Sequence, residues 1–138
     1  MKKMLHLFIL AILVCIHLSA SAEEFQGKVV GVMDGDTISV MRDGKAISVR
    51  LNGIDAPEDN QAFAARAKKA CSDLCFDKQI TAKIFGMDRY GRTLADIILP
   101  DGTNLNQEMV KQGYAWWFRE YAREDKTLQL LEYRAKKE

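Results

Sequence analysis

Five short segments rich in valine and isoleucine, separated by turn residues, constrain the fold of this 138-residue chain more than any other feature. They span residues 25–33, 37–41, 46–51, 80–85 and 93–99. Asp43-Gly44, between the second and third segments, is typical of a two-residue β-hairpin. The pattern predicts a small, mainly β domain.

Helical periodicity is found at three places outside these segments. Apolar residues at three- and four-residue spacing predict a helix over residues 58–74. A shorter helix, capped by Asn106, runs to Gln112 and is closed by Gly113, and a last helix begins at about Asp125. The prediction is therefore an α+β fold in which a five-stranded oligonucleotide/oligosaccharide-binding (OB) barrel carries three packed helices.

The first 22 residues are typical of a secretory signal. Lys2 and Lys3 precede an apolar run over residues 4–18, and Ala20-Ser-Ala22 supplies small residues before a cleavage site. The run is shorter than the roughly 20 residues that cross a bilayer, so a membrane anchor is the less favoured alternative. We expect one domain over residues 23–138, secreted or periplasmic, with no stable membrane association once the signal is removed.

Charge and histidine content exclude several kinds of site from residues 23–138. Without Lys2 and Lys3, 18 of the 20 Lys and Arg residues remain against 19 Asp and Glu, a net charge of −1, so a polyanion must be held by local positive charge or by a metal. Both histidines, His6 and His17, lie in the predicted signal. Imidazole catalysis and histidine-based zinc sites are therefore excluded, and a general base must be a carboxylate, Lys, Tyr or metal-bound hydroxide.

Two cysteines lie in the predicted domain, in Cys71-Ser-Asp-Leu-Cys75. An exported location and the four-residue spacing permit a disulfide if Cys75 lies beyond the end of a helix. The alternative is a pair of buried thiols on one apolar helix face. The sequence leaves both possibilities open.

Carboxylates flank the predicted second and third strands. Asp34-Gly-Asp36-Thr37 opens the second strand, and Asp55 and Glu58 follow the third, which Pro57 ends. Antiparallel neighbours bring the start of one strand beside the end of the other, so Asp36 and Asp55 should meet. Such carboxylates repel unless a cation lies between them, and oxygen ligands favour calcium, magnesium or manganese. The alternative for the Asp-Gly-Asp sequence is a simple polar turn.

Arg50 and Arg92 are the candidates to bind an anion near these carboxylates. Arg50 lies on the third strand, five residues before Asp55, and Arg92 ends the tight turn Asp88-Arg-Tyr-Gly-Arg92. A guanidinium binds phosphate oxygens with paired donors that lysine does not reproduce. Taken singly, each arginine has the alternative of a surface ion pair.

Four motifs in this order resemble the staphylococcal-nuclease-like (thermonuclease) family. They are DGDT at 34–37, VRLNGIDAPE at 49–58, DRYGR at 88–92 and the stretch from Asn106 through WWFREYA at 116–122. The resemblance covers almost all of residues 25–138 and implies cleavage of the P–O5′ bond of DNA or RNA, leaving 3′-phosphate ends. It departs from the staphylococcal enzyme between Glu58 and Phe63, where four residues replace a longer, lysine-bearing loop.

The resemblance also implies a metal site. One calcium ion per chain would be bound by the carboxylates of Asp36 and Asp55 and by the backbone carbonyl of Ala56. Asp34 and Thr37 would lie next to these ligands but would not be bound to the ion. We expect this calcium ion for two reasons, the family resemblance and a set of ligands that are all oxygen atoms.

Catalytic and substrate-binding roles follow from the same resemblance. Glu58 would activate or orient the attacking water, while Arg50 and Arg92 would hold the phosphate. Tyr90 and Tyr121 resemble positions near the nucleotide, with packing at the barrel edge as the alternative.

The sequence therefore predicts an exported, monomeric, calcium-dependent nuclease that acts on DNA and RNA. One alternative is a non-catalytic OB barrel that binds nucleic acid or another polyanion. Another is a structural or adhesive barrel whose carboxylates bind calcium for stability. Because the chain has both the carboxylates and the arginines, we favour the enzyme; for Trp116 and Trp117, core packing is favoured over base stacking.

Overall fold

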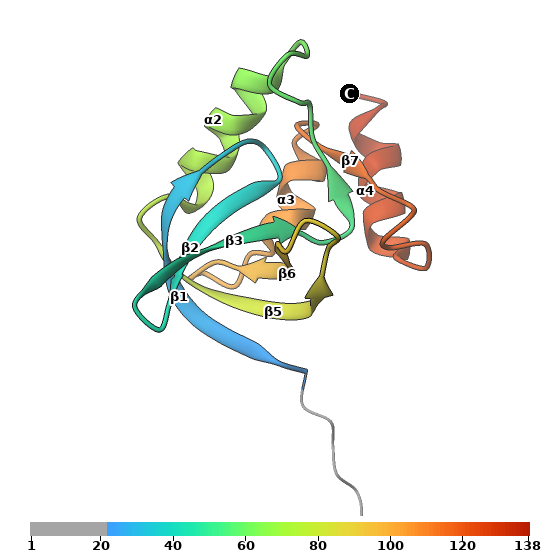
Figure 1. Ribbon diagram of the computed structural model, residues 1–138. Helices are drawn as coiled ribbons and strands as arrows, with labels where there is room; N and C mark the ends of the chain where they lie inside the picture. The colour runs from blue at the N-terminus through green and yellow to red at the C-terminus, as the bar shows by residue number, and fades with distance from the viewer. Residues whose placement is uncertain (1–21) are drawn as a thin grey trace, which may run out of the picture.

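The structure, a computed structural model, describes residues 22–138 (Figure 1). The predicted export signal, apart from Ala22, lies outside the described residues, so its cleavage stays a prediction. Within residues 22–138, no helix has the length and apolar character needed to cross a lipid bilayer.

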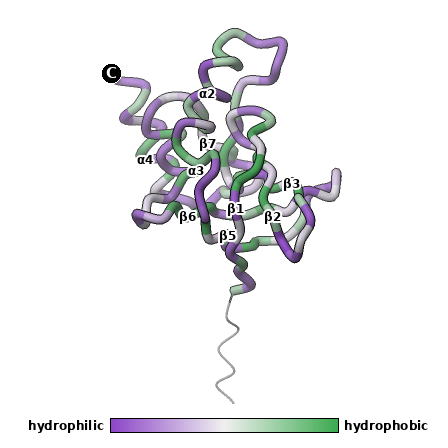
Figure 2. Tube along the Cα trace, turned by 90° about the vertical axis from the view of Figure 1, so that its left-hand side faces the viewer, coloured by the Kyte–Doolittle hydropathy of each residue, from purple (hydrophilic) through white to green (hydrophobic). Residues whose placement is uncertain are grey.

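Five strands of the described chain close into a barrel, as the sequence predicts. They are β1 (Glu24–Val32), β2 (Thr37–Arg42), β3 (Lys45–Leu51), β5 (Gln79–Met87) and β6 (Thr93–Ile98), in the spatial order β1-β2-β3-β6-β5. Neighbouring strands are antiparallel, except that β3 and β6 run parallel. Valine and isoleucine side chains such as Val40, Val49 and Ile97 are completely buried in the barrel core. Figure 2 shows hydrophobic and hydrophilic residues mixed along the strands, with hydrophilic residues prominent at the exposed turns.

The turn between β2 and β3 is the two-residue hairpin predicted from Asp43-Gly44. Both residues have positive φ angles, 49° and 76°, as a type I′ turn requires. This turn fixes the register of the hairpin, and at its opposite end Thr37 pairs with Arg50. The start of β2 therefore lies beside the end of β3.

Three helices of the described chain lie beside the barrel (Figure 1). They are α2 (Ala64–Cys75), α3 (Leu105–Lys111) and α4 (Lys126–Ala135). The short helix α3 contacts both α2 and α4. The start of α4 is as predicted, because the Asp125 side chain caps it by accepting a hydrogen bond from the Leu128 N–H.

Two other helix starts differ from the sequence prediction. Residues 58–63 form bends and turns, so α2 begins at Ala64 and not at Glu58. The cap of α3 is Asn104, not Asn106. Asn106 is buried within the helix, where its amide oxygen accepts from the Ile97 N–H and its amide nitrogen donates to the Asn52 carbonyl. The reason is tertiary: Asn106 joins α3 to the barrel instead of ending the helix.

A two-stranded sheet lies beside the barrel and was not predicted. In it β4 (Ile54–Asp55) runs antiparallel to β7 (Trp116–Trp117), with Asp55 opposite Trp116. Trp117 is buried in the core, as expected, whereas Trp116 is 38 % exposed. The core prediction is therefore wrong for Trp116.

The two cysteines of the described chain are free and buried. Their Sγ atoms are 4.0 Å apart, well beyond the length of an S–S bond. Cys75 is the last residue of α2 and not a residue beyond its end, so both thiols lie on one helix face. The buried-thiol alternative is the one observed.

Candidate active site

The Asp-Gly-Asp turn and the end of β3 meet at one end of the barrel, as the antiparallel register predicts. The Asp36 carbonyl accepts a hydrogen bond from the Leu51 N–H at 2.8 Å. Gly35 lets the turn lie directly against α2, because a Cβ at this position would be 2.8 Å from the Ala67 Cβ. Close packing therefore fixes the position of Asp36.

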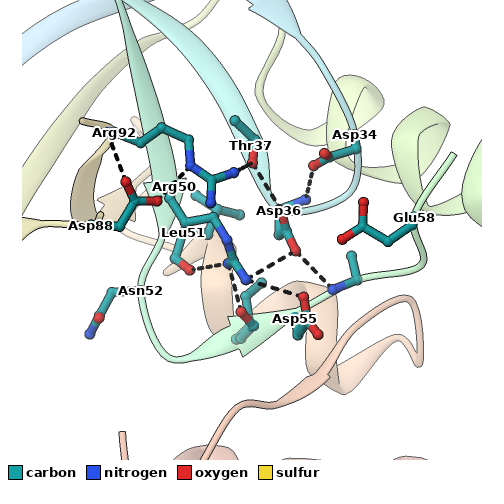
Figure 3. A network of polar contacts seen from close by, with 12 residues as sticks. Asp34, Asp36, Thr37, Arg50, Leu51, Asn52, Asp55, Glu58, Asp88 and Arg92 are labelled. Carbon is teal, nitrogen blue, oxygen red and sulfur yellow. Dashed lines mark hydrogen bonds and ion pairs between the residues drawn. The ribbon is translucent and has the colours of Figure 1, made fainter. Parts of the chain in front are cut away.

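The Arg50 guanidinium lies between the carboxylates of Asp36 and Asp55 (Figure 3). Its Nη2 is 3.4 Å from Asp36 Oδ2 and 3.1 Å from Asp55 Oδ1. Its Nη1 donates to the carbonyls of Leu51 and Ile54, at 3.0 and 2.7 Å. Arg50 is only 6 % exposed. The chain itself thus supplies a positive charge between the two carboxylates that the sequence brings together.

Further hydrogen bonds hold Asp36 and its turn. Asp36 Oδ2 accepts from the Ala56 N–H and Oδ1 from the Thr37 hydroxyl, both at 2.9 Å. Asp34 Oδ1 accepts from the Asp36 N–H, also at 2.9 Å. Burial raises the pKa of Asp36, although Arg50 and the hydrogen bonds act in the opposite direction. Burial, and then the charge of Asp36, raise the pKa of Asp34.

The donor chemistry of this turn fits a hard divalent cation. Asp36, Asp55 and Ala56 offer carboxylate and carbonyl oxygens, the ligand type that calcium takes in a shell of about six to eight oxygens. Within residues 22–138, no three Asp, Glu, Cys or His side chains are grouped as a metal cluster. Backbone and water oxygens would therefore complete the coordination of an ion held by these residues.

Arg92 is oriented by a residue that the sequence analysis did not single out, Asp88. Asp88 Oδ2 accepts from Arg92 Nε at 2.6 Å, and Oδ1 accepts from the backbone N–H groups of Tyr90 and Arg92, both at 2.9 Å. Arg92 Nη1 also donates to the Thr37 hydroxyl at 3.4 Å. An aspartate in a Gly-containing turn often accepts a hydrogen bond from the backbone N–H two residues later. This local pattern is the sequence signal that could have identified Asp88.

Glu58 and Arg92 line one open groove, together with Ser48 and Tyr90. The groove has a volume of about 590 Å³. Glu58 is exposed, and Figure 3 shows its carboxylate directed toward the space beside Asp36. The Tyr90 ring is 69 % exposed and lies 5.4 Å from the Arg92 guanidinium carbon. This open groove thus has a carboxylate, a guanidinium and an aromatic ring in its wall. It lies beside the acidic cluster, by which we mean Asp36 and Asp55.

Tyr121 does not line this groove in the structure. Its ring packs edge-on against Phe118, with 5.0 Å between centroids. This contact corresponds to the packing alternative for Tyr121. Tyr90 alone of the two tyrosines is brought to the wall of the groove.

A comparison with protein families now bears on this geometry. The family model for staphylococcal nuclease homologues matches residues 48–138, which is more than half of the chain. The chain belongs to this family. Three of the four motifs recognised in the sequence lie within the matched residues, so membership of the staphylococcal nuclease family confirms the resemblance and agrees with the closed five-stranded barrel.

Curated relatives in the staphylococcal nuclease family are similar over most of this chain. An uncharacterized endonuclease of Escherichia coli O157:H7 is 41 % identical over 115 residues, 83 % of this chain and 74 % of that protein. An uncharacterized endonuclease of Haemophilus influenzae is 44 % identical over 115 residues, 83 % of this chain and 64 % of that protein. A micrococcal nuclease of Shigella flexneri is 44 % identical over 108 residues, 72 % of this chain and 62 % of that protein.

Proposed function

We propose that this chain is a calcium-dependent nuclease that hydrolyses phosphodiester bonds of DNA and RNA. The observation that carries the proposal is the common groove of Glu58 and Arg92, which opens beside the acidic cluster of Asp36 and Asp55. Such a hydrolysis needs a general base for the attacking water and a positive group that stabilises the charge developing on the phosphate oxygens. Membership of a nuclease family supports the same conclusion.

Asp36, Asp55 and Ala56 are the residues that would hold the calcium ion. When bound, the ion would add positive charge beside the phosphate and so lower the energy of the transition state. Thr37 and Asp34 hold the carboxylate and backbone of Asp36, which keeps its oxygens in place. The choice of calcium over magnesium or manganese rests on the family resemblance and the oxygen donors.

Glu58, Arg92, Arg50 and Tyr90 each have a separate task in this proposal. Glu58 accepts the proton of the attacking water, because its carboxylate faces the groove and solvent. Arg92 binds the phosphate with its terminal nitrogens, since Asp88 engages its Nε. Arg50 lies between Asp36 and Asp55 and balances their charge, and the family resemblance is what supports a further role for it toward the phosphate. Tyr90 packs against the nucleotide next to the scissile bond.

The test is cleavage of single- and double-stranded DNA and of RNA, with calcium or with excess chelator. We expect cleavage only with the divalent cation, and 3′-phosphate ends on the products. Glu58→Gln and Arg92→Ala should each slow single-turnover cleavage, with a loss of about a hundredfold to a thousandfold for a donor that acts mainly in the transition state. Asp59→Asn and Arg89→Ala remove the same charges from neighbouring exposed positions and serve as matched controls.

The two alternatives give different results in the same experiment. A non-catalytic binder would lose DNA affinity on Arg92→Ala, whereas Glu58→Gln would leave affinity equal or higher because it removes a negative charge. A structural barrel would gain thermal stability from calcium without cleaving either nucleic acid. Undiminished cleavage in chelator would refute the role of the metal.

We also propose that the chain is exported and acts as a monomer, since one chain supplies every residue of the site. The proposal of export rests on the charged, apolar and small-residue order of residues 1–22. Intact-mass analysis of secreted or periplasmic protein should give a chain that begins at Glu23. A mass that retains residues 1–22 would show an anchor instead, and light scattering would test the monomer.

A further inference from the structure

A second groove, apart from the one that Glu58 and Arg92 line, runs along α2. It consists of two adjoining hollows, of about 620 and 320 Å³, that share Arg66, Gln112 and Tyr114 as lining residues. One wall is formed by α2 and the other by the turn that follows α3. We call this feature the α2 groove.

Aromatic rings that the fold leaves in solvent line the larger hollow. Phe63 is 65 % exposed and Trp116 is 38 % exposed, although their neighbours Ala64 and Trp117 are buried. Large aromatic side chains gain several kcal/mol on burial elsewhere, so their exposure in one hollow indicates a site that binds flat, apolar groups.

The backbone at Phe63 is strained in a way that keeps its ring in the groove. Phe63 has φ 67° and ψ −2°, the left-handed region, and it caps α2 without any side-chain hydrogen bond. A residue with a Cβ costs about 1–2 kcal/mol more than glycine in this conformation, and helix caps are normally Ser, Thr, Asp or Asn. An exposed phenylalanine is thus held where folding alone would favour glycine or a polar cap.

Positive charge lies along the same groove. The Arg66 guanidinium is 5.3 Å from the Phe63 ring centroid, and no ion pair of Arg66 is found within residues 22–138. Lys69 also lines the groove and makes a solvent-exposed pair with Asp73, another lining residue, so Arg66 supplies the positive charge in excess. Because residues 23–138 carry a net charge near zero, this is local positive charge of the kind a polyanion needs.

The α2 groove adjoins the proposed active site through the chain itself. Pro57 lines the α2 groove, and the next residue, Glu58, lines the catalytic groove. Gln61 lines the α2 groove and accepts a hydrogen bond from the Glu58 N–H at 2.7 Å. Trp116 pairs with Asp55 across the β4–β7 sheet. A ligand that leaves the catalytic groove past Glu58 therefore meets Phe63 and Trp116.

We propose that the α2 groove binds the unpaired strand of the nucleic acid beyond the scissile phosphate, with bases stacked on Phe63 and Trp116 and phosphates held by Arg66 and Lys69. The inference rests on the proposed nuclease function and adds a binding subsite outside the catalytic groove. Exposed aromatic faces next to cations are the chemistry that recognises single strands, because the bases of a duplex already stack on one another. The site is tolerant of base sequence, since every base offers an aromatic face.

Binding without cleavage tests this directly. The probe is a labelled oligothymidylate of about twelve nucleotides, titrated with protein in excess chelator. Trp116→Ala and Phe63→Gly should each raise its Kd about tenfold, which is near the lower end for loss of one base stack. Arg66→Gln should reduce the slope of log Kd against log salt by about 0.7, the value for one single-strand phosphate contact. Tyr133→Ala on α4 and Lys45→Gln at the start of β3 are matched exposed controls that should change neither quantity.

Phe63→Gly also separates binding from folding. Glycine adopts the left-handed conformation without the Cβ penalty, so this variant should unfold at the same urea concentration as the parent, or at a higher one. Weaker oligonucleotide binding with undiminished stability supports the proposal. Unchanged Kd in Phe63→Gly and Trp116→Ala would overturn it, even if Trp116→Ala proved unstable.

Cleavage kinetics then test the α2 groove as a single-strand site separately from the proposed nuclease function. With calcium, the variants should raise KM for the long single strand, and the increase should be smaller for duplex DNA and for a dinucleotide that ends within the catalytic groove. Equal increases for all three substrates would overturn the α2 groove as a single-strand site. Active parent protein with no effect of the variants would refute this inference alone. Oligonucleotide binding that depends on Trp116 in a chain that cleaves nothing would refute the nuclease and leave the groove supported.

Discussion

Arg50→Ala should lower the free energy of unfolding as well as slow cleavage, because Arg50 is a structural cation at the centre of the site. The substitution removes two hydrogen bonds to the carbonyls of Leu51 and Ile54 and the ion pairs with Asp36 and Asp55. Asp36 stays buried, at 5 % exposure, and loses its positive partner. Breaking one half of a buried ion pair costs about 3–5 kcal/mol, a large share of the roughly 5–15 kcal/mol that stabilises a domain.

The pH dependence of this loss has a definite sign. Burial raises the pKa of Asp36 while Arg50 lowers it, so removing Arg50 raises that pKa further. A carboxyl whose pKa is higher in the folded state than in the unfolded state destabilises the fold once it ionises. The difference between parent and variant should therefore grow as the pH rises from about 4 to 7 and Asp36 ionises.

Urea unfolding in chelator and in calcium measures both effects. In chelator Arg50→Ala should lose several kcal/mol, and calcium should restore part of this and stabilise the variant more than the parent, because it returns positive charge to Asp36 and Asp55. Arg42→Ala breaks an exposed pair with Glu23 and should change stability by less than about 1 kcal/mol. If Arg50→Ala unfolded within about 0.5 kcal/mol of the parent in chelator, Arg50 would not be a structural cation.

Three further predictions concern residues around the site and in the core. Asp88→Asn should lower single-turnover cleavage about tenfold to a hundredfold, because the amide no longer orients Arg92 through its Nε; a rate equal to the parent's would remove Asp88 from the mechanism. Burial raises the pKa of Asp96, so its ionised form destabilises the fold. In urea titrations, Asp96→Asn should therefore gain stability relative to the parent as the pH rises from about 4 to 7. A difference that stays constant with pH would contradict the raised pKa. Cys71 and Cys75 should both be alkylated in denatured, non-reduced protein and protected in folded protein, as peptide mass mapping would show; a mass two hydrogens lower would reveal a bridge.

The barrel could be predicted because local sequence patterns determine its strands and its hairpin turn. Alternating apolar residues set each strand, and Asp43-Gly44 supplies the left-handed conformations that a tight hairpin needs. The start of α2 could not be predicted, because the apolar spacing continues back to Phe63, and the chain has no capping residue there. Asn106 has the side chain of a cap, but contacts with β6 and Asn52 decide its place. At Asn106, therefore, long-range contacts override the local preference for a helix cap.

The residues of the candidate site could be proposed from the sequence, but the sequence accounts for only part of their arrangement. Antiparallel register is enough to bring Asp36 and Asp55 together, since it depends on strand order alone. The position of Arg50 between them depends on the Asn-Gly bend after β3, which directs the carbonyl of Ile54 toward the guanidinium. Asp88 and the exposed ring of Trp116 depend on a turn and on a two-residue strand pairing, neither of which leaves a periodic signal.

The two arginines of the site therefore differ in what a substitution can reveal. Arg50 is enclosed and has carbonyl and carboxylate partners on both terminal nitrogens, so its loss mixes folding with catalysis. Arg92 is held mainly by Asp88 through Nε, with a longer hydrogen bond of 3.4 Å from Nη1 to the Thr37 hydroxyl, and its guanidinium lines the open groove, where a ligand can reach it. A rate lost on Arg92→Ala in a protein of unchanged stability is the direct sign of transition-state binding. The same loss on Arg50→Ala carries that meaning only after the stability of the variant has been measured and, with calcium, restored.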